Sequence, residues 1–167
     1  MLRTKDALRL GIHPETLYRL RDSGELTRLS RGLYRLSDLP PLANPDLITV
    51  ALKIPAAVIC LISALAFHEL TTQIPHEVYL ALPRGAEAPR LDHPPIRIFW
   101  FTNRAFTFGA EKHKLDNAQV QSYSSEKTVA DCFKYRYKIG LETAREALKL
   151  YLEGGKKNLG TLLEAAE

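Results

Sequence analysis

The chain has 167 residues, of which 46% are hydrophobic and 25% charged, and its formal net charge is +4. That length suits one ordinary domain, or a small module joined to a second compact unit. The longest apolar run, Ile54–Phe67, contains Pro55 and is too short to span a bilayer. The N-terminus lacks the apolar core of a signal peptide, so we expect a cytoplasmic protein.

The positive charge is unevenly distributed. Residues 1–36 contain eight Lys/Arg and four Asp/Glu, and the remaining residues contain fifteen of each. The net charge therefore resides in the first 36 residues, which favours a polyanionic partner for that segment. The alternative is that this charge is only a small surplus of surface arginine, which is common in proteins.

Two cysteines, Cys60 and Cys132, lie in apolar segments far apart in the sequence. Two isolated cysteines make neither a zinc site nor a disulfide framework. We expect reduced thiols in the core, and we expect neither a metal nor a cofactor.

The first part of the chain predicts two short helices. The first spans about Thr4–Leu10, with Thr4 as its N-cap, and Gly11 stops it. Pro14 suits the first position of the second helix, which ends near Ser23–Gly24. Two short helices joined by a three-residue turn are typical of a helix-turn-helix.

A basic hairpin follows these helices. Leu26–Leu29 and Leu33–Leu36 predict two strands around Ser30–Gly32, with Arg31 projecting from the tip. Helix, turn, helix and hairpin together predict a winged helix-turn-helix. A complete winged helix usually has a further helix before these two. We therefore expect either that this chain starts late relative to that fold, or that a helix from its second part completes the core of the module.

The second helix predicts an exposed face for a partner. Glu15, Tyr18, Arg19 and Asp22 recur at i, i+3, i+4 and i+7, and Leu17 and Leu20 point to the other side. A helix in the major groove reads base edges with such side chains, whereas wing residues reach the backbone or minor groove. The candidate DNA contacts are His13, Glu15, Thr16, Tyr18 and Arg19 near bases, Arg21 at the flank, and Arg28, Arg31 and Arg35 on the wing. The alternative is a solvated helix face with local charge pairing.

A proline-rich linker separates two units. We predict a DNA-binding module at residues 1–38, a linker at 39–45 and an α+β domain at 46–167. The predicted strands of the second unit are Val78–Leu82, Ile96–Phe101 and Val120–Tyr123. Its predicted helices are Asp46–Lys53, Ser125–Lys138 capped by Ser124, Leu141–Leu152 and Asn158–Ala166. Ala56–Leu70 fits either buried helices or a strand and a helix, and Thr102–Asn117 gives no clear prediction. The last helix has no closing turn signal, which leaves open a longer domain.

No enzyme site emerges from the sequence. His68-Glu69 would need a second histidine where Thr72 stands to form a zinc-protease motif. Ser63 and Ser124 lack a nucleophile elbow, and there is no Gly-rich phosphate loop. Charge pairing along one helix explains the charged residues Glu126, Lys127, Asp131 and Lys134.

Aromatic residues cluster at Phe99–Phe101, near Arg97 and Arg104. They could stack on single-stranded RNA, but buried strand residues look the same, and we favour the core. Two alternatives to DNA binding therefore stay open: an RNA-binding protein that uses the second domain, and a protein-interaction module that keeps a winged fold without reading DNA.

The segment GIHPETLYRLRDSGELTRLSRGLYRL resembles the N-terminal winged helix-turn-helix of the AbiEi family of antitoxin-type transcriptional regulators. The resemblance continues at Ser63–Leu70 and at Tyr123–Asp131, where Ser125 replaces the proline usual in the family. It implies a repressor of its own operon and the antitoxin of a type IV toxin-antitoxin system. The implied partners are repeated double-stranded operator DNA and a nucleotidyltransferase-like toxin, without a stable complex.

Overall fold

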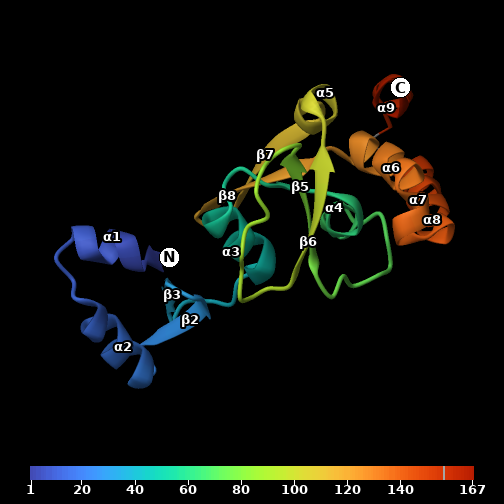
Figure 1. Cartoon of the computed structure of the whole chain (residues 1–167). Coiled ribbons are helices and arrows are strands. Elements are labelled where there is room, and N and C mark those ends of the chain that lie inside the picture. Colours follow the sequence, from blue (N-terminus) through green and yellow to red (C-terminus); the bar gives the residue numbers. More distant parts are fainter. Residues whose placement is uncertain (156) are drawn as a thin grey trace.

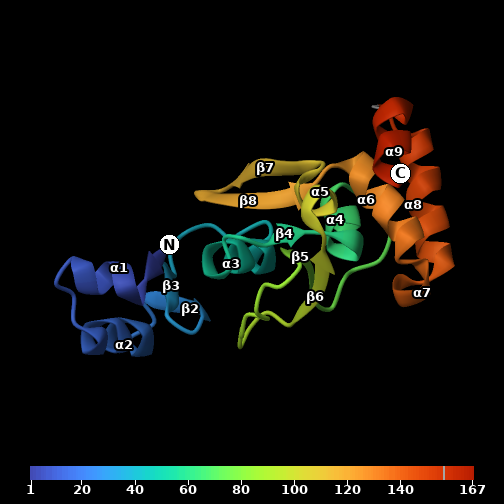
Figure 2. The ribbon, with the colours of Figure 1, turned by 45° about the horizontal axis from the view of Figure 1, so that its top comes forward.

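Two separate sheets organise the chain, and each is covered by its own helices. The computed structural model describes residues 1–155 and 157–167. The N-terminal module and the C-terminal helices lie at opposite ends of the molecule (Figure 1, Figure 2). Helices and antiparallel and parallel strands occur together, so the α+β class is confirmed.

The N-terminal module is a winged helix-turn-helix. Its elements are β1 (Leu2–Arg3), α1 (Thr4–Arg9), α2 (Pro14–Asp22), β2 (Leu26–Ser30) and β3 (Leu33–Leu36). The sheet has the order β1-β3-β2 and is antiparallel throughout. The prediction of two helices and a hairpin is therefore confirmed, and the short strand β1 was not predicted.

Strand β1 changes the expected start of the first helix. The chain is extended through Arg3, which occupies the N-cap position without a side-chain cap. Thr4 is the first helical residue, and its backbone N–H donates to the carbonyl of Gly32 at 3.0 Å. The prediction of Thr4 as the N-cap was wrong: β1, which pairs with β3, ends at Arg3, so Arg3 takes the N-cap position and the helix begins one residue earlier than expected.

The module has its own small core. Ala7, Leu17, Leu26 and Tyr34 are buried together. Leu2, Ile12 and Leu20 pack against them. Every member of this core that the structure describes lies between residues 2 and 34. A supporting helix from the second part, one of the two alternatives, does not contribute to this cluster, and β1 supplies Leu2.

The second part is built on a five-stranded mixed sheet of order β6-β5-β4-β8-β7. Its elements are α3 (Pro45–Lys53), β4 (Val58–Ile59), α4 (Leu61–Phe67), β5 (Val78–Pro83), β6 (Ile96–Phe101), α5 (Asn103–Thr107), β7 (Ala110–Leu115), β8 (Ala118–Tyr123), α6 (Ser125–Lys134), α7 (Arg136–Ile139), α8 (Leu141–Glu153) and α9 (Leu159–Ala166). The pairs β5–β6 and β4–β8 are parallel, and β4–β5 and β7–β8 are antiparallel.

Both faces of this sheet are buried along its inner strand β5. Val78, Leu80 and Leu82 of β5 join a cluster with α3, whereas Tyr79 and Ala81 join a cluster with α4, α6 and α8. Successive side chains of a strand point to opposite faces, which explains this division. A strand covered on both faces is apolar throughout, as the sequence of β5 shows.

Most predicted boundaries of the second part agree with the structure, with one correction. The segment after Pro55 forms a strand and a helix, the second of the two alternatives. Helix α6 ends at Lys134 rather than near Lys138, and Tyr135 separates it from α7. The unassigned segment 102–117 contains α5 and β7.

Candidate nucleic-acid interface

Helix α2 begins with two residues that favour its start. Pro14 occupies the first turn, where its missing N–H is harmless, and Nδ1 of the His13 cap accepts from the backbone N–H of Glu15 at 3.4 Å. Glu15 lies in the first turn and Arg19 and Arg21 in the last, in accord with the helix dipole. His13 therefore has a structural role in addition to the predicted DNA contact.

The outer face of α2 is exposed. Leu17 is 1% exposed and anchors the helix, whereas Tyr18 is 46% exposed. Glu15, Arg19 and Asp22 are also exposed, as predicted from their spacing. The side chain of Arg19 forms no hydrogen bond or ion pair with the residues that the structure describes, so its guanidinium is available to a partner.

Arg21 is held against its own helix. Its Nε donates to Asp22 Oδ1 at 2.8 Å, and its guanidinium lies 5.4 Å from the centre of the Tyr18 ring. This arrangement keeps Arg21 at the flank of α2. The acidic partner reduces its attraction for a phosphate.

The wing, residues 26–36, meets α2 in a shallow hollow of about 370 Å³. The hollow is lined by Thr4, Tyr18, Arg21, Arg28, Arg31, Gly32 and Tyr34. Gly32 has φ +71° and leaves little room beside it, because a Cβ there would lie 3.3 Å from Thr4 Oγ1. The fold thus gathers four predicted contact residues from helix and wing: Tyr18, Arg21, Arg28 and Arg31.

Two of the three wing arginines already have partners. Arg28 donates to Asp92 at 3.1 Å, and Arg35 donates to the carbonyls of Leu39 and Pro40. Arg35 therefore stabilises the start of the linker and lies apart from the hollow. The predicted contacts of the three wing arginines with DNA stay a prediction.

The wing tip contacts the second part of the chain. The backbone N–H of Arg31 donates to the Asp92 carboxylate, and Nζ of Lys53 donates to the Arg31 carbonyl. The Arg31 side chain is exposed. Lys53 and Asp92 were not among the predicted site residues, because nothing in the local sequence signals a contact with the wing.

Residues 1–37 match the family model described as transcriptional regulator, AbiEi antitoxin. This match covers the N-terminal module and not the rest of the chain. No curated protein matches the chain. The expected resemblance at Ser63–Leu70 and Tyr123–Asp131 lies outside the matched residues and stays a prediction. Ser125 is the first residue of α6, a position that also suits the proline expected there.

The second part of the chain offers weaker support for nucleic-acid binding than the N-terminal module does. Phe99 and Phe101 are 4% and 3% exposed and belong to the core, as favoured from the sequence. Trp100 is 47% exposed, but its Nε1 donates to the carbonyl of Ala86 at 3.0 Å. For the RNA-binding alternative, Trp100 is the one exposed ring of Phe99–Phe101, which is a small platform for stacked bases.

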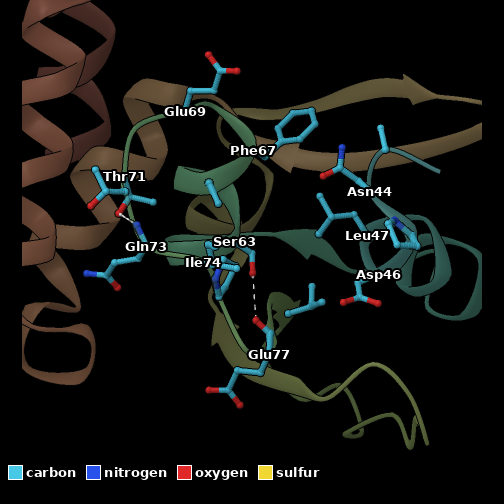
Figure 3. A pocket seen from close by; sticks show the side chains of 16 residues that line it. Asn44, Asp46, Leu47, Ser63, Phe67, Glu69, Thr71, Gln73, Ile74 and Glu77 are labelled. Carbon is cyan, nitrogen blue, oxygen red and sulfur yellow. Dashed lines mark hydrogen bonds between the residues drawn. The ribbon is translucent and has the colours of Figure 1, made fainter. Parts of the chain in front are cut away.

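A hollow of about 470 Å³ opens between the start of α3 and the end of α4 (Figure 3). Ser63 lies on its wall, where it donates to the carbonyl of Glu77 at 3.4 Å and accepts from the N–H of Tyr79 at 2.9 Å. Its hydroxyl is therefore engaged in two hydrogen bonds to the backbone and does not face a general base. His68, at the end of α4, donates from Nε2 to the carbonyl of Tyr123 at 2.7 Å.

Lys127 and Asp131 form a buried ion pair, with 4% and 3% of their side chains exposed. The predicted i, i+4 charge pairing on this helix is confirmed for these two residues, and the structure adds that the pair is buried. They face the core beside Phe101 and Tyr123, because α6 packs on the sheet through this side.

Among the described residues, no helix is both long and apolar enough to cross a membrane. The same residues contain no group of three or more His, Cys, Asp or Glu side chains that could hold a metal ion. Cys60 and Cys132 are buried free thiols, and burial raises the pKa of both.

Proposed function

We propose that the chain is a sequence-specific DNA-binding transcriptional repressor. The observation that supports this most is the outer face of α2, which is exposed while Leu17 holds the opposite face in the core. A helix presented in this way fits the major groove. The family match of residues 1–37 to AbiEi antitoxin regulators points in the same direction.

In the proposed complex, α2 lies in the major groove. Arg19 has no competing partner among the described residues and can bond a guanine in bidentate fashion. His13, Glu15, Thr16 and Tyr18 line the same helix and approach neighbouring bases. Arg21 and the wing residues Arg28, Arg31 and Arg35 contribute the sequence-independent attraction to phosphate.

We further infer an antitoxin context. By analogy with the family, the protein represses its own operon and counteracts a nucleotidyltransferase-like toxin without forming a stable complex. Residues 1–38 would then read the operator, and residues 46–167 would carry the antitoxin role, joined by the linker at 39–45. Action on DNA implies a cytoplasmic location, and repeated operator sites would suit an oligomer.

Gel-shift measurements with the DNA upstream of the gene test this proposal. Arg31→Ala should weaken binding to all duplexes alike, whereas Arg19→Ala should remove the preference for the upstream DNA over a scrambled duplex. Losing one bidentate arginine contact costs about tenfold or more in discrimination. Arg145→Ala, on α8 in the second part, is the matched control and should bind like the wild type. Equal affinity of all four proteins for both duplexes would overturn the proposal.

A further inference from the structure

Asp92 binds the wing tip through three different kinds of donor. Oδ1 accepts from the Ser30 hydroxyl at 2.9 Å, and Oδ2 accepts from the Arg28 guanidinium at 3.1 Å. The backbone N–H of Arg31 lies 3.3 Å from Oδ2 and 3.4 Å from Oδ1. The hydroxyl of Ser30 contributes most to lowering the pKa of Asp92, followed by the N–H of Arg31.

The wing is shaped to offer these donors. The register of β2 and β3 shifts between Arg28 and Ser30, and such a bulge re-aims the side chains next to it. Ser30 is 3% exposed, so its hydroxyl points toward a partner rather than into water. A buried hydroxyl without a partner is costly, and this position therefore requires an acceptor.

The same donor set suits a phosphate. Hydroxyls, backbone amides and guanidinium groups are the groups that hold DNA phosphates, and all three donate to acceptor-only oxygens. A carboxylate and a phosphodiester share a negative charge and two exposed oxygens. Asp92 thus accepts the hydrogen bonds of the wing tip in the way that a backbone phosphate would.

The surroundings of Asp92 also favour an anion. A hollow of about 710 Å³ beside it is lined by Arg31, Lys53 and Arg90, together with Asp92 itself. These three cations form no ion pair with the residues that the structure describes. The carboxylate of Asp92 therefore lies among positive charges from both parts of the chain. A phosphate in its place would be attracted by the same charges.

We propose that Asp92 occupies a binding site for a DNA backbone phosphate, formed by Arg28, Ser30 and Arg31, and that DNA must displace it. This inference rests on the proposed DNA-binding function. In the free protein Asp92 offsets one positive charge of the wing and holds the wing against the second part. In the complex a phosphate takes its place, and Lys53 and Arg90 lie beside the same strand of the duplex.

Fluorescence anisotropy with a labelled upstream duplex tests the site. Asp92→Asn keeps the size of the side chain but removes its charge, so affinity should rise about fivefold, and the slope of log K against log salt should steepen by about one unit. Glu87→Gln removes one negative charge from the same loop without touching the wing contacts, and it should bind like the wild type. Adding Ser30→Ala to Asp92→Asn should reverse the gain, since the phosphate loses its hydroxyl donor.

The outcomes separate this inference from the proposed function. If the wild type binds and Asp92→Asn binds no better than Glu87→Gln, Asp92 is a brace for the wing and the phosphate site is overturned. If no protein of the set binds DNA, the proposed function fails and the inference fails with it. Should Asp92→Asn not fold, as judged by thermal melting, Asp92→Ser replaces it in the same assay, because it also removes the negative charge.

Discussion

Lys127 and Asp131 are the charged residues most completely withdrawn from water by the fold. Nζ of Lys127 donates to Oδ1 of Asp131 and lies 5.1 Å and 5.2 Å from the ring centres of Phe101 and Tyr123. Burial raises the pKa of Asp131, and the charge of Lys127 opposes that rise. Each charge therefore depends on the other, because neither has bulk water to stabilise it.

We expect Lys127→Met to lower the free energy of unfolding by about 3–5 kcal/mol, the usual cost of leaving one partner of a buried pair alone. Urea unfolding followed by circular dichroism measures this change. The control is Lys149→Met, at an exposed i, i+4 pair with Glu153, where the change should stay within about 0.5 kcal/mol. Equal effects of the two substitutions would show that the buried pair has no special role.

A neighbouring glycine makes room for this pair. Gly109 has φ +68°, and a Cβ at this position would lie 2.8 Å from Cβ of Lys127. Ser124 caps the same helix by accepting from the N–H of Lys127 at 3.3 Å. The stretch Ser124–Asp131 is thus explained by capping and by a buried ion pair, and needs no catalytic role.

One carboxylate on helix α8 joins that helix to the loop that follows α4. Glu146 of α8 accepts from the Thr72 hydroxyl at 2.7 Å, the Thr71 hydroxyl at 3.0 Å and the Thr72 N–H at 3.3 Å. These bonds, with the Thr72 hydroxyl first, lower the pKa of Glu146. The loop after α4 is thereby attached to α8.

This attachment predicts a dependence of stability on pH. Because the pKa of Glu146 is lower in the folded chain, its contribution is present above the ordinary value of 4.5 and is lost as the pH falls through the folded value. Urea unfolding between pH 6 and pH 3 should show a smaller acid loss for Glu146→Gln than for the wild type. Glu142→Gln, an 85% exposed carboxylate on the same helix, should keep the wild-type profile, and identical profiles for all three would contradict the prediction.

Elements with a strong local pattern were predicted well. Helix α2 has a proline at its start and a glycine after its end, and β5 is an unbroken apolar run, so local chemistry fixes their bounds. Strand β1 has two residues and exists because β3 pairs with it, and such a strand has no periodic signal of its own. Strand β7 is mostly exposed and charged, and its pairing with β8 is likewise not visible in its sequence.

The second part of the chain binds the wing of the N-terminal module through Asp92. Ser30 and Asp92 are 62 positions apart in the sequence, and the loop between β5 and β6 brings Asp92 to the wing. The exposed face of α2 could be predicted from spacing within one helix. The partner of Arg28 and the role of Lys53 could not be predicted, because both depend on how segments far apart in the sequence meet.

Selection from a random pool of DNA duplexes tests the central claim, that the exposed face of α2 reads DNA sequence. We expect the wild type to enrich a common motif over successive rounds. Arg19→Ala should lose that motif or relax one base position, and the Arg145→Ala control should enrich the same motif as the wild type. No enrichment by the wild type, or an identical motif from Arg19→Ala, would contradict this account.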